Sequence, residues 1–518
     1  MNQEPLRKNN WAKILALCAC VITIFIFLKN AWISEDAYIT FRSIEQLFAG
    51  RGPIWNPHER VQVFTSPLWF WMLAGVRLFT TDIFLGTIIL SFCLLLVLLW
   101  IIWKTVHDEW KFLLVVLLLA ASNGFFDYTS SGLENILAYG IIAGFTAIYF
   151  QLFFREEVPQ KSEEFYRKKF FSILMLFGLL VLVRHDLSLL LFPGVVYLLA
   201  KKRNLISLKK GILISLVVLL PLIIWSVFSL IYYGFPFPNT AYAKLNTGIS
   251  NRVLAMQGFQ YFISSLKYDP ITLILIGAVG LYTILLSRKH HSLWPLLVGI
   301  FIHFLYVGYI GGDFMRGRFF SYAYLIAVLL FAQGLNFRSY PKTRIIFVVV
   351  VLYLFLFPHT PFNSPFDYGN DRVEAGIADE RGIYFRALSL RQYWKSKIHQ
   401  QEYPSHIWCQ EGKAAEGISV FRNVGLVGYC ADLDAIIIDQ NALTDPLLAR
   451  IPVTGYWRIG HFQREIPPGY LENIAGETAR IENYQINGLY QRIVLITQSE
   501  ALFSAQRLRE IVRLNLEW

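Results

Sequence analysis

Two adjacent carboxylates, Glu35 and Asp36, lie at the start of the segment SEDAYITFRSIEQLFAG, residues 34–50. The pattern predicts a helix from Ser34 to Phe48 that ends at Gly50. In the simplest interpretation Ser34 caps this helix, and both acids lie in its first turn, where the helix dipole stabilises negative charge. Two chemical roles are also open. A carboxylate at a membrane surface can accept the proton of an attacking hydroxyl, and a pair can bind a divalent cation such as Mg²⁺ or Mn²⁺.

Basic side chains recur in short polar segments between apolar stretches. They are Arg184 and His185 in VRHD, Lys244 in PNTAYAKL, and Arg316 and Arg318 in GGDFMRGRFF. Each one alone could cap a helix or pair with a nearby acid, such as Asp186 or Asp313. On one side of a membrane they would together form a phosphate site, because arginine offers a planar fork of donors and lysine a point charge. A phosphate at the edge of a bilayer suggests a lipid phosphate.

The composition indicates which kind of scaffold must position these residues. The 518 residues are 55% hydrophobic and only 16% charged, with a mean hydropathy of +0.46, which is typical of a polytopic helical membrane protein. We expect about eleven transmembrane helices, at residues 12–30, 83–103, 112–126, 133–154, 170–183, 187–200, 211–233, 270–287, 292–311, 319–335 and 344–358. The apolar stretch 67–79 is shorter than the roughly 20 residues that a span needs, so we expect it to lie at the membrane face.

The net charge of +11 is explained by topology rather than by a nucleic-acid partner. Lys and Arg gather before the first predicted span and in alternate connections, which are typical of cytoplasmic loops. These basic residues are Arg7, Lys8, Lys13, Lys104, Lys111, Arg155, Lys161, Arg167, Lys168, Lys169, Lys201, Lys202, Arg203, Lys209, Lys210, Arg288, Lys289, Arg338, Lys342 and Arg344. The N-terminus is then cytoplasmic. Segments 31–82, 127–134, 184–186, 234–269, 312–318 and everything after about residue 359 are then external.

The composition of the sequence changes near residue 358. We therefore expect a membrane domain (1–358) and an external domain (359–518). The second part is more polar and rich in Gly and Pro, and we expect a mixed α/β domain with a core of its own. It contains Cys409 and Cys430. On an oxidising exterior these two form either a disulfide or two buried free thiols, and the sequence favours neither. The stretch 12–30 predicts a retained anchor rather than a cleaved signal.

No Walker loop, GxGxxG, HExxH or GxSxG sequence is present, so the usual signatures of nucleotide binding and of zinc or serine hydrolysis are missing. The external segments instead combine acids, bases and aromatic rings. Trp55, Trp69 and Trp71 follow the Glu35–Asp36 pair. Such rings form interfacial belts in membrane proteins, and they can also stack on sugar rings.

The stretch EDAYITFRSIEQLFAGRGPIWNPHERVQVFTSPLW closely resembles a known pattern. This is DDAYIxFRYAxNLxxGxGxxWNPGERVEGYTSPLW, found in a bacterial group of GT-C membrane glycosyltransferases that includes mycobacterial terminal β-(1→2) arabinofuranosyltransferases. SSGLEN, PNTAYAKL, GGDFMRGRFF, ADERG and LTDPLLARIP are similar to further segments of that group. The resemblance spans most of the chain. Two departures are Glu35 in place of Asp, and NPHERVQVF in place of NPGERVEGY, which leave metal dependence and the acceptor open.

The resemblance implies a transferase that uses a polyprenyl-phosphate sugar, possesses the GT-C fold and carries its catalytic acid in the first external loop. Asp36, assisted by Glu35, would be the base, and a bound cation would sit on this pair. The donor phosphate would be bound by Lys244, Arg316, Arg318, Arg184 and His185. Further substrate-binding positions are Arg42, Trp55, Asn56, Thr65, Ser66, Glu134, Asp313, Asp445 and His461.

The reaction expected from this resemblance is an inverting transfer of a sugar, an arabinofuranose-like pentose for example, to an envelope glycan. It would take place on the outer face of the bacterial inner membrane. The alternative is a transporter or flippase of lipid-linked sugars, which predicts inverted repeats that the sequence does not display. A receptor or scaffold would leave the acid-bearing loop unexplained. A phosphoethanolamine transferase would need a Ser or Thr nucleophile beside a dense metal cluster.

Overall fold

The computed structural model describes residues 10–153, 163–201, 208–245, 247–286, 291–334, 343–477 and 480–517. Several basic residues that predict the topology lie outside the described residues, so the orientation in the membrane stays a prediction. These are Arg7, Lys8, Arg155, Lys161, Lys202, Arg203, Arg288, Lys289, Arg338 and Lys342.

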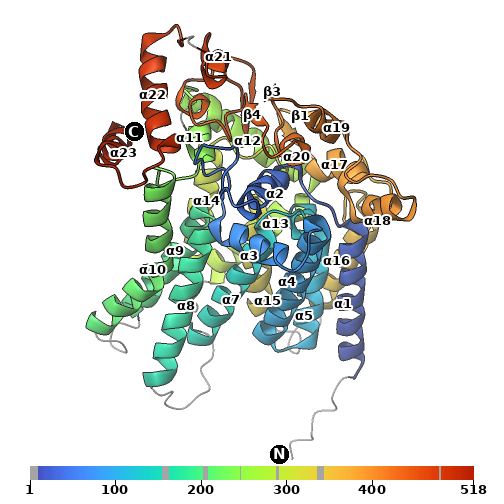
Figure 1. Ribbon diagram of the computed structural model, residues 1–518. Helices are drawn as coiled ribbons and strands as arrows, with labels where there is room; N and C mark the ends of the chain where they lie inside the picture. The colour runs from blue at the N-terminus through green and yellow to red at the C-terminus, as the bar shows by residue number, and fades with distance from the viewer. Residues whose placement is uncertain are drawn as a thin grey trace, which may run out of the picture.

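Each of the eleven predicted spans falls on helical structure. The helices are α1 (Asn10–Asn30), α4 (Ile83–Val106), α5 (Glu109–Ala121) with α6 (Asn123–Phe126), α7 (Asn135–Phe153), α8 (Glu163–Val183), α9 (Ser188–Lys201), α10 (Leu208–Tyr232), α13 (Pro270–Leu286), α14 (Trp294–Tyr309), α15 (Phe320–Gly334) and α16 (Thr343–Leu356). Figure 1 shows most of them as a bundle that fills the lower half of the molecule.

Not every described helix of the bundle is long and apolar enough to cross a bilayer alone. Within the described ranges, four helical segments are long and apolar enough to cross a bilayer: Lys13–Asn30, Ile83–Val106, Asn135–Phe153 and His291–Tyr309. Two bent pairs, with bends of 88° and 104°, raise that number to six if each is one span. The chain is therefore a helical membrane protein, and eleven crossings stay a prediction.

Helix α15 is the centre of the bundle. Its residues from Phe320 to Leu330 are all buried, and it packs against α5, α7 and α13. A helix that is apolar on every side is stable only where other helices surround it. The segments just before α7 and just before α15 meet at one end of the bundle, where Arg318 pairs with Glu134, and these segments carry predicted external residues.

The first loop forms two helices, as its sequence predicts. α2 (Glu35–Phe48) begins after Ser34 and ends before Gly50, which has a φ of +79°. Ser34 occupies the N-cap position, but its hydroxyl makes no capping hydrogen bond, so the simplest interpretation of this motif is incomplete. α3 (Pro67–Arg77) is an 11-residue helix, and at about 1.5 Å per residue it is too short to cross a bilayer.

The remaining elements lie above the bundle in Figure 1. They are α11 (Asn239–Leu245), α12 (Asn251–Tyr268), α17 (Glu380–Leu388), α18 (Leu390–Ile398), α19 (Ile407–Lys413), α20 (Gly425–Cys430), α21 (Tyr470–Ile474), α22 (Tyr484–Gln498) and α23 (Ala505–Glu517). The strands are β1 (Val373–Glu374), β2 (Ile377–Ala378), β3 (Ile418–Phe421), β4 (Ile436–Asp439), β5 (Trp457–Arg458) and β6 (His461–Phe462). They pair as β1–β2 and β5–β6, both antiparallel, and β3–β4, which is parallel.

The C-terminal region and the first loop share their hydrophobic contacts. Ile39, Trp55 and Val63 from the loop pack with Val424 and Ile437 in one buried cluster. α20 lies directly against α2, and a disulfide between Cys409 and Cys430 ties α19 to α20. Residues 31–82 and 359–518 are therefore one packed unit on top of the helical bundle.

Candidate active site

A cavity of about 760 Å³ lies where the first loop, the bundle and the C-terminal region meet. Residues from α2, α11, the ends of α14 and α15, and the β5–β6 hairpin line it. Nine of the predicted site residues are among them. These are Asp36, Thr65, Ser66, Glu134, Arg184, His185, Lys244, Asp313 and Arg318.

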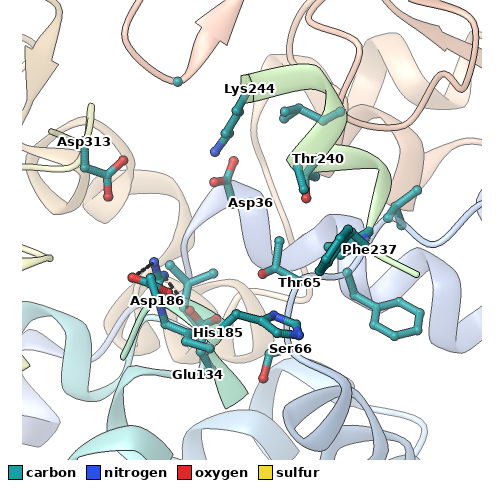
Figure 2. Close-up of a pocket in the computed structure, with 18 of the residues that line it drawn as sticks. Asp36, Thr65, Ser66, Glu134, His185, Asp186, Phe237, Thr240, Lys244 and Asp313 are labelled. Carbon is teal, nitrogen blue, oxygen red and sulfur yellow. Dashed lines mark hydrogen bonds and ion pairs between the residues drawn. The ribbon is translucent and has the colours of Figure 1, made fainter. Parts of the chain in front are cut away.

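Asp36 reaches this cavity from the first turn of α2. Its carboxylate makes no hydrogen bond or ion pair with any residue in the described part of the chain, and it points toward the ammonium of Lys244 (Figure 2). Burial raises the pKa of Asp36, whereas the cations Lys244 and Arg318 act to lower it. A carboxylate that is free of partners and has a raised pKa is suited to accept a proton.

Glu35 does not share this cavity with Asp36. Consecutive helical residues point in different directions, and the Oε1 of Glu35 accepts a hydrogen bond from the backbone N–H of Leu426 at 2.8 Å. Burial, followed by the charge of Asp36, raises the pKa of Glu35 to about 8. Glu35 therefore joins α2 to α20.

The two carboxylates do not converge as the predicted cation site requires. Among the described residues, no group of three or more His, Cys, Asp or Glu is arranged to hold a metal ion. A divalent cation in this cavity would have to be bound by Asp36 without Glu35.

A network of ion pairs centred on Glu134 forms the floor of the cavity. Glu134 accepts from Arg184 Nη1 and from Arg318 Nη2, each at 3.0 Å. Arg184 also forms a bidentate pair with Asp186 at 3.0 Å for both contacts, and Arg318 Nη1 lies 3.7 Å from Asp313 Oδ2. Burial alone would raise the pKa of Glu134, but the two arginines hold it below its usual value.

This network changes the interpretation of the predicted phosphate site. Of the described residues that line the cavity, four are carboxylates and three are Lys or Arg. Arg184 and Arg318 are paired with acids, whereas Lys244 makes no hydrogen bond or ion pair with a described residue and is exposed. Burial lowers the pKa of His185, so its ring is neutral at pH 7. Lys244 is therefore the cation most available to an incoming anion.

Three residues of the first-loop motif serve the fold instead of lining the cavity. Arg42 is fully buried, and its guanidinium donates to the backbone carbonyls of Trp55 and Ala435 at 3.2 and 2.9 Å. Trp55 Nε1 and Asn56 Nδ2 both donate to the carbonyl of Ile437. The prediction that Arg42, Trp55 and Asn56 touch substrate is not supported by these positions, because their polar groups are used to join the loop to β4 and its neighbours.

Three other predicted residues lie outside the cavity: Arg316, Asp445 and His461. Arg316 stacks on Tyr268, with its guanidinium carbon 3.8 Å from the ring centroid, and donates to Ser264. Asp445 accepts from Tyr470 and from the backbone of Leu448.

His461 lies on the β5–β6 hairpin, with Nε2 3.2 Å from Arg458 Nη2. Its neighbours Gly460 and Phe462 line the cavity.

The cavity also has an apolar wall that the sequence analysis did not identify. Phe237, Leu245, Tyr306, Ile310 and Phe319 contribute to it. Thr240 lies one helical turn before Lys244 and faces the same space (Figure 2). The segment PNTAYAKL was singled out for its lysine, and its helical spacing could have indicated Thr240 as well.

Comparisons with known proteins confirm the resemblance that the motifs predict, although no family model matches the chain. A terminal β-(1→2)-arabinofuranosyltransferase of Corynebacterium glutamicum is 30% identical over 351 residues, which is 59% of this chain and 48% of that protein. The chain thus spans about half the length of this relative. A protein of the same name from Mycobacterium tuberculosis is 22% identical over 525 residues, covering 85% of this chain and 82% of that protein.

Two solved structures are similar in outline. ArnT from Cupriavidus metallidurans, bound to undecaprenyl phosphate, superposes with a TM-score of 0.43 and 14% identity, covering 86% of this chain and 77% of that one. ArnT in the apo state gives the same TM-score and identity.

Proposed function

We propose that this chain is a membrane glycosyltransferase of the GT-C type that uses a polyprenyl-phosphate sugar. The observation that carries the proposal is the meeting of the Asp36 carboxylate and the Lys244 ammonium, neither of which pairs with a described residue, in one cavity with an apolar wall. The relatives named as arabinofuranosyltransferases support a pentose of that kind as the transferred sugar. The acceptor is an envelope glycan on the outer face of the bacterial inner membrane.

The donor binds through its phosphate and its lipid. Lys244 neutralises one phosphate oxygen as a point charge. Arg318 and Arg184, held in place by Glu134, direct their remaining N–H groups to the other oxygens. The first units of the polyprenyl chain lie against Phe237, Leu245 and Phe319 on the apolar wall. Thr65 and Ser66, which also line the cavity, hydrogen-bond the sugar.

The chemical step is a single displacement. An acceptor hydroxyl loses its proton to Asp36 while its oxygen forms a bond to the anomeric carbon. The bond from that carbon to the phosphate oxygen breaks, and polyprenyl phosphate leaves with the electron pair. Attack opposite to the leaving group inverts the anomeric centre. The cations stabilise the leaving phosphate, so positioning and one base supply most of the rate enhancement.

Donor binding also tunes the base. Lys244 and Arg318 lower the pKa of Asp36 in the empty cavity. The negative charge of a bound phosphate offsets these cations, so the proton affinity of Asp36 rises when the donor is in place. The base is then strongest when a reaction is possible. A divalent cation, where one takes part, would be held by Asp36 and would supply positive charge for the leaving phosphate, and EDTA would then abolish turnover.

The test combines a deletion strain with purified protein. The envelope glycan composition is measured in the deletion strain after complementation with wild type, Asp36→Asn or Lys244→Ala, with the amount of protein in the membrane checked for each. Glu465→Gln is the matched control, because Glu465 is an exposed carboxylate outside the cavity. We expect one sugar to disappear on deletion and to return with wild type and with the control only.

The alternative of a lipid-linked sugar flippase makes a different prediction for the purified protein in vesicles. A flippase would move labelled donor across the bilayer and leave the acceptor unglycosylated. A transferase would release polyprenyl phosphate and label the acceptor without moving the donor.

A further inference from the structure

The C-terminal helix α23 is attached to the end of α10. Arg507 Nη1 and Nη2 donate to the backbone carbonyls of Ile231 and Tyr232 at 2.8 and 3.1 Å. Asn515 Nδ2 donates to the carbonyl of Gly234 at 2.8 Å. These carbonyls belong to the last turn of α10 and the residues after it, which have no helical partner of their own. α23 is therefore fixed at the upper end of α10 (Figure 1).

One side of α23 is covered by the C-terminal region. Ile511 and Leu514 are buried in the same cluster as residues of α22. Glu510 and Glu517 both form ion pairs with Arg492 of α22. In Figure 1, α23 lies beside the lower part of α22, above the upper end of α10. The acidic side of α23 therefore faces α22.

The opposite side of α23 is an exposed apolar ridge. Leu508, Val512 and Leu516 follow one another at four-residue intervals, with exposed fractions of 36%, 59% and 82%. Residues at this spacing lie on one face of a helix. At about 100° per residue the ridge lies nearly opposite Glu510, and hence nearly opposite α22. Arg509 and Arg513 border the ridge and are exposed, and Arg513 Nε also pairs with Glu517 Oε1 at 3.3 Å.

The ridge continues an apolar surface that already faces outward from the bundle. α10 is one of the apolar helices of the bundle. Its side chains Leu220, Ile224, Val227 and Leu230 are exposed on the surface of the protein. Such side chains are stable when lipid covers them. α23 joins the end of this surface, and its acids pair with α22, so the ridge and the two arginines that border it are left exposed. Apolar side chains flanked by arginines are typical of helices that lie in a membrane interface.

We propose that α23 is an interface helix that rests in the outer leaflet of the bilayer. Leu508, Val512 and Leu516 enter the boundary between headgroups and acyl chains, and Arg509 and Arg513 bind anionic lipid phosphates. This location does not depend on the proposed reaction. Asn515 also lines the cavity, so the helix sets one edge of the cavity at headgroup level, where a lipid-linked donor would arrive. That second step rests on the proposed function.

The test measures which medium surrounds the ridge. Cys18, Cys20 and Cys93 are replaced by alanine, and a nitroxide label is attached to Leu508→Cys, Val512→Cys or Leu516→Cys in full-length protein in vesicles of phosphatidylcholine and phosphatidylglycerol. Accessibility to oxygen, which partitions into lipid, is compared with accessibility to a water-soluble nickel chelate. Gln506→Cys on the same helix and Tyr484→Cys on α22 are the controls, because both residues are exposed off the ridge.

We expect the oxygen-to-nickel ratio at the three ridge positions to be several-fold above that at both controls. Equal ratios at ridge and control positions would place the ridge in water and overturn the proposal. Protection from both reagents, together with the mass of a dimer, would assign the ridge to a second copy of the chain and would also overturn it.

The arginine contribution is tested at Val512→Cys with Arg509→Gln and Arg513→Gln added. With wild-type arginines the ratio should rise when phosphatidylglycerol is included, and with both glutamines it should stay at the value found in phosphatidylcholine alone. A rise of equal size in both proteins would refute the binding of anionic lipid by these two arginines. Because the label reports location and not turnover, these results are separate from any failure of the transferase assay.

Discussion

The two faces of α2 belong to the same motif but differ in how their polar side chains are paired. On one face, Glu35 and Arg42 are buried, and each is hydrogen-bonded to backbone groups of the C-terminal region. On the other face, Asp36 and Thr40 border the cavity, and the Asp36 carboxylate has no hydrogen-bonding partner among the described residues. The paired face contributes to stability. The unpaired face costs stability, because a partly buried carboxylate is kept without a donor.

The largest effect is expected for Asp36→Asn, which tests whether the cavity face of α2 supplies the base. We expect transfer activity to fall by about 10²- to 10⁴-fold, the usual contribution of a positioned base. The thermal midpoint should stay unchanged or rise slightly, because no hydrogen bond to a described residue is lost and a buried charge is removed. Activity is measured with purified protein, and unfolding is followed in the same detergent. A variant that restores the envelope glycan fully would show that Asp36 only stabilises the first turn of α2.

Arg42→Met tests the opposite face. Methionine is unbranched but shorter than arginine and has no N–H groups, so the change removes the donors to at least two buried carbonyls. We expect a loss of about 3 kcal/mol in the free energy of unfolding. The readouts are the yield of folded protein and its thermal midpoint. Arg422→Met is the matched control, since Arg422 is exposed. Normal stability with low activity would instead place Arg42 in contact with substrate.

Lys244→Gln tests whether Lys244 binds the donor phosphate and lowers the pKa of Asp36. The loss of the point charge should raise KM for the donor by about 10-fold, the effect of about 1.4 kcal/mol. Lys244 lowers the pKa of Asp36, so its removal raises that pKa, and the acidic limb of the kcat/KM profile should move to higher pH.

Lys267→Gln is the control for this experiment, because Lys267 is exposed and paired with Glu374. An acidic limb that moves to lower pH, or does not move, would show that Lys244 does not lower the pKa of the catalytic base.

The smallest effect is expected for Glu35→Gln. Glutamine keeps the oxygen that accepts from Leu426, so activity near pH 7 should change by less than about twofold. The folded pKa of Glu35 is about 8, above its value of about 4.3 in an unfolded chain. Its contribution to stability is therefore complete at low pH and is lost as the pH rises through about 8.

The glutamine variant should accordingly lose less stability than wild type between pH 5 and 8, measured by thermal unfolding. An activity loss as large as that of Asp36→Asn would make Glu35 part of the reaction.

The sequence could predict α2, the short α3 and the helical character of every apolar stretch, because these depend on local patterns of hydrophobicity and turn residues. It also singled out Asp36 and Lys244, since charged residues beside apolar spans are costly to keep. The structure brings both to one cavity, and their roles in the reaction stay predictions. The sequence could not separate Asp36 from Arg42, although both belong to one motif. That distinction depends on which side of α2 is covered, and the covering residue Gly428 is 386 positions away.

The predicted phosphate-binding cations show a second limit of what the sequence can predict. The sequence grouped Arg184, Arg316, Arg318 and Lys244 as one phosphate site. Glu134 neutralises two of them, and Arg316 stacks on Tyr268. Whether a positive side chain is available to a ligand depends on its neighbours in space, and these come from separate helices.

The shared packing of the first loop and the C-terminal region has a consequence for how the protein is made. A ribosome synthesises residues 31–82 well before the stretch around Gly428 and Ile437, since Gly428 follows Arg42 by 386 positions. Until that stretch has been made, Trp55 and Arg42 lack the surfaces that bury them. The helix that carries Asp36 can therefore reach its final position only after residues 428–437 have been produced, and the order of synthesis delays assembly of the cavity.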